Sequence, residues 1–155
     1  MFGVPVDAWY VWLGLSLASI ALIGVGAALP TAPPPSAATA AETVDRTAVT
    51  AHTAAAELPL SAREIRLTPA AIGLRNDAGT THATFAFGPV TPVVGTAALL
   101  AVLHGATPGS RFDSGATLCD AAASARERTP RWRRADDPLV VRHLVWEGCD
   151  VTLVG

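Results

Sequence analysis

The sequence predicts an α+β protein in which an N-terminal transmembrane helix precedes a small antiparallel β-sheet domain with one or two short helices. Three observations lead to this class. An uncharged apolar run occupies residues 8–29. Alternating apolar and polar residues later in the chain are typical of half-buried strands, and two segments there carry helix start and stop signals. Since the chain has 155 residues, we expect an anchor at 1–29, a linker and stalk at 30–58, and one soluble domain at 59–155.

The run at residues 8–29 has the length and composition of a membrane-spanning helix. It contains no charged side chain, and at about 1.5 Å per residue it reaches roughly 33 Å, enough for a hydrocarbon core of about 30 Å. Trp9, Tyr10 and Trp12 lie at one end, as in an interfacial aromatic belt, and Pro30 closes the other. We predict a single-pass protein of the cell membrane that contacts the lipid bilayer through this run.

Two alternatives to an anchor fit the run less well. A cleaved signal peptide has a basic start and a shorter apolar core, whereas no Arg or Lys precedes Arg46. A helix buried in a soluble fold keeps a polar face, which this run lacks. The orientation does not follow from flanking charge, because Arg46 lies seventeen residues beyond Leu29. The small residues Gly14 and Ala18 would let a second helix approach, but such pairs also arise by chance in alanine-rich spans.

Residues 30–58 have the composition of a spacer. The prolines at 33–35 predict an extended, polyproline-like segment. The alanine-rich stretch at 36–57 favours a short helix, with one apolar face made of Val44, Ala48, Ala51 and Ala55. Because that stripe is thin, a disordered stalk is the alternative. Pro59 ends the stretch in either case.

The soluble domain begins with three predicted strands. Apolar and polar residues alternate over 63–68, 71–75 and 81–87. The turn sequence Asn-Asp-Ala-Gly at 76–79 separates the last two, and it predicts an antiparallel hairpin.

Two short helices and two further strands follow. Thr96 can cap a helix that ends at Gly105, and Thr117 can cap another that runs to about Arg128. Residues 139–146 are apolar on both faces, as in a central strand, and a turn at Glu147-Gly148 leads into a last strand at 149–154.

The two cysteines, Cys119 and Cys149, can form a disulfide if the second helix packs beside the last hairpin. Closing that loop would restrict the unfolded chain by about 3.5–4 kcal/mol in the entropy model. The alternative is two buried thiols that act as small apolar residues.

An arginine-rich segment surrounds one tryptophan and is a candidate partner-docking patch. It consists of Arg126, Arg128, Arg131, Trp132, Arg133 and Arg134. Glu127, Asp136 and Asp137 lie among them and leave a surplus of two positive charges. The alternative is a solvated loop that is internally paired, with Trp132 folded onto the sheet.

No catalytic or metal-binding pattern is present in the sequence. The four histidines, at 52, 82, 104 and 143, lack metal-ligand spacing. No nucleophile elbow, P-loop or dinucleotide glycine pattern occurs. We predict no cofactor and no metal, and the net charge of −2 gives no reason to expect nucleic acid.

Four stretches together resemble a haloarchaeal family of small membrane proteins of unknown function. The similarity runs over most of the chain, and the four stretches read VPVDAWYVWLGLSLAS, LPTAPPP, RNDAGTTHATFAFGPVTPV and CDVTLVG. The layout of helix, stalk and sheet domain is also similar to type IV pilin-like or Tad-like components of pili and secretion systems. The chain departs from pilin precursors in lacking a basic residue before a processing site and a glutamate just inside the helix.

From these features we expect a membrane-anchored extracytoplasmic protein that is not an enzyme. The resemblance implies an accessory component of a pilus-like or secretion assembly, with membrane proteins as partners. A membrane-tethered ligand-binding or sensory ectodomain is the alternative, and a deep polar pocket near His82 or His143 would favour it. A tethered hydrolase is the third candidate and would need a convergent Ser, His and Asp.

Overall fold

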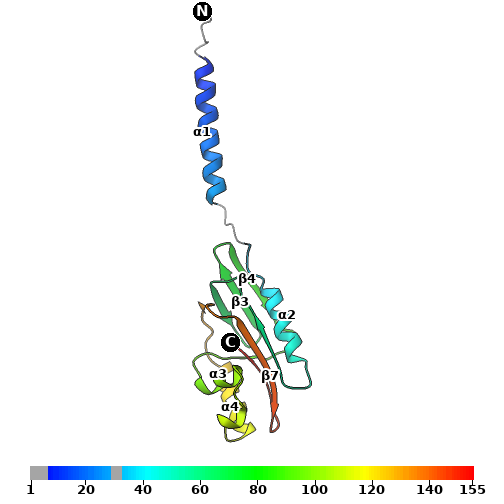
Figure 1. Ribbon diagram of the computed structural model, residues 1–155. Coiled ribbons are helices and arrows are strands. Elements are labelled where there is room, and N and C mark those ends of the chain that lie inside the picture. The colour runs from blue at the N-terminus through cyan, green and yellow to red at the C-terminus, as the bar shows by residue number, and fades with distance from the viewer. Residues whose placement is uncertain (1–6, 29–32) are drawn as a thin grey trace, which may run out of the picture. The chain divides into compact units, whose positions relative to one another are not determined.

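The computed structural model describes residues 7–28 and 33–155, with the side chains of the first helix described over residues 9–21. The chain divides into two compact units, Met1–Pro33 and Pro34–Gly155. The first contains helix α1, Asp7–Ala28. The second contains the other helices and all the strands described (Figure 1).

Over residues 9–21, helix α1 is apolar on every side and exposed. Its large apolar side chains are 59–74% exposed. Ser16 and Ser19 donate hydrogen bonds to the carbonyls of Trp12 and Leu15, each over 2.8 Å. The two hydroxyls are therefore satisfied within the helix, and the described surface is almost entirely hydrocarbon.

In the described part of the chain, no helix combines the length and the apolar character that a membrane crossing requires. The predicted transmembrane anchor at 8–29 is therefore wrong. The predicted localisation, a single-pass membrane protein with an extracytoplasmic domain, depends on that anchor and is wrong as well. Pro30, predicted to close the span, lies outside the described residues.

The second unit is α+β and contains two sheets instead of the one that was expected. The first sheet has the order β1-β7-β8-β5. Its strands are β1 (Ala54–Leu58), β5 (Thr91–Pro92), β7 (Leu139–Trp146) and β8 (Cys149–Val154). Strands β7 and β8 form the predicted C-terminal hairpin. The pairing of β5 with β8 is parallel, so this sheet is mixed and not purely antiparallel.

The second sheet is antiparallel throughout, in the order β4-β3-β2-β6. Its strands are β2 (Glu64–Leu67), β3 (Ala71–Asn76), β4 (Gly79–Thr84) and β6 (Arg133–Arg134). The predicted hairpin is formed by β3 and β4. At its turn the Asn76 side-chain oxygen accepts a hydrogen bond from the Ala78 N–H at 2.9 Å, and Gly79 has a φ of +148°, which glycine adopts without strain.

Three α-helices and one short 3₁₀ helix (Pro108–Ser110) complete the unit. Helix α2 spans Ala37–Ala48, α3 spans Ala97–Leu103 and α4 spans Gly115–Arg126. Helix α3 lies where the sequence predicts it. Helix α4 begins earlier than the predicted Thr117 cap, because Ser114 is the N-cap and forms a capping box with Thr117.

The first sheet is the middle layer of the unit. In Figure 1, α2 lies on one side of β7, and α3 and α4 lie on the other. One face of the sheet packs on α2 and the second sheet, around a core that includes Val44, Ile65, Ile72, Leu74, Leu139 and Val141. The other face packs on α3 and α4, around a core that includes Leu99, Val102, Leu118, Leu144, Val151 and Leu153.

Helix α2 and strand β1 belong to the domain, although the sequence places them in a stalk at 30–58. The residues of α2 that face the first core are Ala37, Ala40, Ala41 and Val44, which are at most 4% exposed. Alanine has so little side-chain surface that hydropathy alone does not distinguish this buried face from an exposed one. The Asp45 carboxylate also accepts hydrogen bonds from the Ala86 and Phe87 N–H groups at 2.9–3.1 Å, which joins α2 to the segment after β4.

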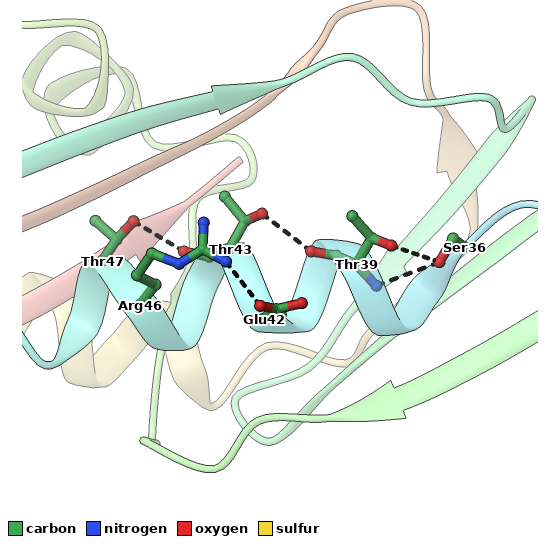
Figure 2. A network of polar contacts seen from close by, with 6 residues as sticks. All are labelled: Ser36, Thr39, Glu42, Thr43, Arg46 and Thr47. Carbon is green, nitrogen blue, oxygen red and sulfur yellow. Dashed lines mark hydrogen bonds and ion pairs between the residues drawn. The ribbon is translucent and has the colours of Figure 1, made fainter.

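The opposite face of α2 is polar and is satisfied locally (Figure 2). Ser36 caps the helix by accepting a hydrogen bond from the Thr39 N–H at 3.3 Å. Arg46 pairs with Glu42 one turn away at 2.7 Å. Because these contacts lie within the helix, they stabilise it without linking it to anything outside.

Candidate functional site

The arginine segment at 126–134 does not form one continuous patch. Strand β6 pairs with β2, so that Arg133 lies opposite Ile65 and Arg134 opposite Glu64. Opposite residues of an antiparallel pair point to the same face. Arg133 therefore lies on the face of the buried Ile65, and Arg134 lies on the outer face of the sheet.

Trp132 packs against the outer face of the second sheet and is not a free docking aromatic. The Arg75 guanidinium lies over its ring, 4.7 Å from the centroid, and the His82 ring meets it edge-on at 6.0 Å. Gly73 leaves the space for this packing, since a Cβ there would come within 2.8–3.0 Å of His82 and Trp132. The indole thus covers β3, as the alternative reading of this segment expects.

A polar cavity of about 580 Å³ lies beside β2 and the β3–β4 turn. Its charged lining residues are Arg63, Glu64, Arg75, Asp77, Arg134 and Asp136. Arg63 pairs with Asp77 at 2.6 Å, and the Arg75 Nε donates to Glu64 at 2.6 Å. Since equal numbers of acidic and basic groups line it, the cavity has little net attraction for an ion of either sign.

A smaller groove, of about 260 Å³, lies between the end of β2, the β5 segment and the end of α4. We call it the arginine groove. Its apolar lining comes from Leu67, Pro69, Pro92, Val94, Ala125 and Pro130. Its charged lining is Arg128, Arg131 and Arg133, with no acidic residue.

The arginines of this segment are held in different ways. Arg128 donates a hydrogen bond to the Val94 carbonyl. Burial lowers the pKa of Arg133 below its ordinary value, and the negative charge of Asp137 partly offsets this. Arg126 does not line the groove. It donates a hydrogen bond to the Thr91 hydroxyl at 3.0 Å, and burial lowers its pKa as well. Arg126 is therefore half-buried and engaged by a side chain of β5.

The two cysteines are joined in a disulfide, with an S–S distance of 2.04 Å. It ties α4 to the start of β8, at the edge of the second core. The bond therefore cross-links a helix to the central sheet.

Two of the histidines, His143 and His82, are engaged by other side chains of the domain. His143 is buried, with its Nδ1 3.2 Å from the Thr152 hydroxyl and 3.6 Å from the Asp150 carboxylate. His82 packs on Trp132, and neither His82 nor His143 lines the two cavities above. Over residues 7–28 and 33–155, no three side chains of His, Cys, Asp or Glu gather where they could hold a metal ion.

The aromatic residues predicted to mark a membrane interface lie on α1. Trp9, Tyr10 and Trp12 are 74%, 72% and 69% exposed. The exposed apolar surface of α1 and the arginine groove are therefore two candidate interaction surfaces. The floor of the groove was not foreseen, because its residues come from three separate segments and no local motif links them.

Comparison with known protein families gives a match over most of the chain. The model of a family of unknown function, DUF7283, matches residues 3–144. No curated protein and no solved structure matches the chain. The chain belongs to this family, in agreement with the unknown-function part of the resemblance described above.

Proposed function

We propose that this chain is a non-enzymatic subunit that acts by binding partner proteins, as an accessory component of a larger assembly. The observation that carries the proposal is the exposed apolar surface of α1. Its members, each at least 59% exposed, are Trp9, Tyr10, Val11, Trp12, Leu13, Leu15, Leu17 and Ile20.

A helix that is apolar all round is normally buried, and contiguous exposed apolar surface marks an interaction site. Fully covering one large apolar side chain contributes about 1.5–3 kcal/mol. Apolar helices of partner subunits would therefore bind α1 strongly. This mode of association needs no charged group, and residues 9–21 of α1 carry none.

The polar features of the domain support a non-enzymatic role. In the polar cavity, Arg63 and Arg75 are already paired with Asp77 and Glu64. His143 is engaged by Thr152 inside the domain. These groups satisfy one another instead of converging on a common point where a substrate would react.

A pilus-like or secretion assembly is the kind of partner complex that we propose. The order of an apolar helix and then a small sheet domain is the layout of pilin-like components, and the haloarchaeal origin of the family is part of the same proposal. The layout differs from the predicted one because α2 belongs to the sheet domain.

The proposal is tested by affinity purification of the tagged full chain from its native cells after mild cross-linking. In the test variant, Leu13, Leu17 and Ile20 are replaced by glutamine, which has nearly the helix propensity of leucine. The matched control is Val145→Ser, which changes an apolar residue of β7 that is 49% exposed.

We expect wild type and Val145→Ser to co-purify with the same proteins, and the triple glutamine variant to lose them while keeping the circular dichroism of the folded domain. Two results would contradict the proposal. One is recovery of the wild-type chain without any protein partner, whether alone or with lipid only, and the other is full retention of partners by the triple variant.

A further inference from the structure

The arginine groove is a second surface whose composition points to a specific ligand chemistry. Its floor is apolar, with Leu67, Pro92 and Val94 contributed by the two sheets and the segment after β5. Three guanidinium groups line it, and no carboxylate does. A ligand that fits both parts must carry an apolar group and a negative charge close together.

Two of the three arginines are available to such a ligand. Within residues 33–155, the guanidinium groups of Arg131 and Arg133 make no hydrogen bond and no ion pair, while Arg128 is engaged by the Val94 carbonyl. Arg131 is exposed and Arg133 is half-buried. Partial removal of a cation from water is costly. At Arg133 the charge of Asp137 offsets that cost only in part, and a bound carboxylate would offset more of it.

The size of the groove limits the ligand. At about 260 Å³ it falls below the roughly 300–1,000 Å³ typical of sites for cofactors and drug-sized molecules. It can hold one or two apolar side chains, in the way that pockets along an interface hold the anchor residues of a bound peptide.

We propose that the arginine groove binds an acidic, apolar peptide segment of a partner protein. An apolar side chain of the segment occupies the floor, and the carboxylate of a neighbouring Glu or Asp pairs with Arg133 and Arg131. Guanidinium groups suit this role because their planar fork bonds a carboxylate through two parallel hydrogen bonds. This inference rests on the proposed function only in taking the ligand to be a protein, and it concerns a different surface from α1.

The test measures binding of a blocked, fluorescently labelled peptide, acetyl-Glu-Leu-Glu-Phe-Glu-amide, by fluorescence anisotropy. The full chain is kept in a non-ionic detergent, because exposed apolar surface such as that of α1 promotes aggregation. Two control peptides separate the contribution of the carboxylates to binding from that of the apolar side chains. In one, every glutamate is replaced by glutamine, and in the other the leucine and phenylalanine are replaced by alanine.

Variants of the protein locate the site. Arg131→Gln and Arg133→Gln each remove one candidate partner of the carboxylate, and Arg131→Glu reverses a charge that is exposed and thus outside the core. Arg111→Gln is the matched control, because Arg111 is an exposed arginine outside the groove. Circular dichroism shows whether each variant is folded.

We expect saturable binding that weakens roughly tenfold for each groove arginine removed, weakens more with Arg131→Glu, and is unchanged in Arg111→Gln. Both control peptides should bind at least tenfold more weakly, and affinity should fall as salt rises, because salt screens exposed charges. The inference is overturned if the labelled peptide does not bind, if the glutamine peptide binds equally well, or if the groove variants bind like wild type. It is also overturned if decanoate, an amphipathic anion that is not a peptide, binds the groove while the peptide does not.

The two proposals can fail separately. The triple glutamine variant of α1 should bind the peptide as tightly as wild type does. If the chain captures its partners but does not bind the peptide, the proposed role of the groove is wrong and the proposed role of α1 is unaffected. Loss of partner capture with normal peptide binding would contradict the role of α1 alone.

Discussion

Replacing Val44 by alanine tests whether α2 is part of the folded domain. Val44 lies on the face of α2 that packs into the first core and is 0% exposed. If the helix were a stalk in solvent, the substitution would be neutral or slightly stabilising, because alanine has the higher helix propensity. In the structure it removes two methyl groups from a packed interior.

The expected loss follows from these contacts. Removing buried methyl groups costs about 0.8 kcal/mol each, or roughly 1.6 kcal/mol for two. The cavity left behind destabilises the fold by about 1 kcal/mol more. The higher helix propensity of alanine stabilises it by about 0.5 kcal/mol. We therefore expect Val44→Ala to lower the free energy of unfolding by about 2 kcal/mol.

The matched control is Val49→Ala, at the C-cap of α2, where the side chain is 53% exposed. Urea denaturation of the full chain, followed by tryptophan fluorescence, gives both values. The control should change the free energy of unfolding by less than about 0.5 kcal/mol. Equal and small effects of the two substitutions would refute the placement of α2 in the core.

Three further predictions concern single contacts in the domain. Replacing both Cys119 and Cys149 by alanine should lower the free energy of unfolding by about 3.5–4 kcal/mol in the loop-entropy model, and a thermal melt unchanged by reduction would contradict this. Gly115→Ala should destabilise by about 1–3 kcal/mol, because its Cβ would lie 2.5 Å from the Glu147 carbonyl oxygen; an unchanged melting temperature would show that the helix start can move freely. Asp45→Asn should cost about 1 kcal/mol by weakening charged hydrogen bonds to two backbone N–H groups, and unaltered hydrogen exchange at those groups would count against it.

Local patterns in the sequence were sufficient for much of the domain. The hairpin of β3 and β4 and the hairpin of β7 and β8 both lie where alternation and turn residues predict them. In each case the two strands are neighbours in sequence, so one turn determines the pairing.

Pairings between distant segments could not be predicted in the same way. Strand β1 reads AAAEL and pairs with β7 much later in the chain, although alanine and glutamate are depleted in strands. Helix α2 buries mainly alanine, which gives a weak apolar stripe whether it is buried or exposed. The division into two sheets depends on these contacts, and the sequence alone does not indicate them.

The candidate site was predicted only as a cluster of charges. The run of arginines was evident, but the pairing of β6 with β2 determines which face each residue takes. It places Trp132 over Gly73 and leaves Arg131 and Arg133 lining the groove. The apolar floor comes from residues near 67, 92 and 125, which only the folded chain brings together.

The most direct test of the central claim, that α1 binds partner proteins, is photo-cross-linking from within that helix. A photoreactive phenylalanine derivative is placed at Leu17, which is 62% exposed, in the full chain in its native cells. The account predicts covalent products with one or a few specific proteins, identified by mass spectrometry, and far fewer when the probe replaces the exposed Val145 of β7. Cross-links to lipid alone, or no cross-linked protein at all, would contradict it.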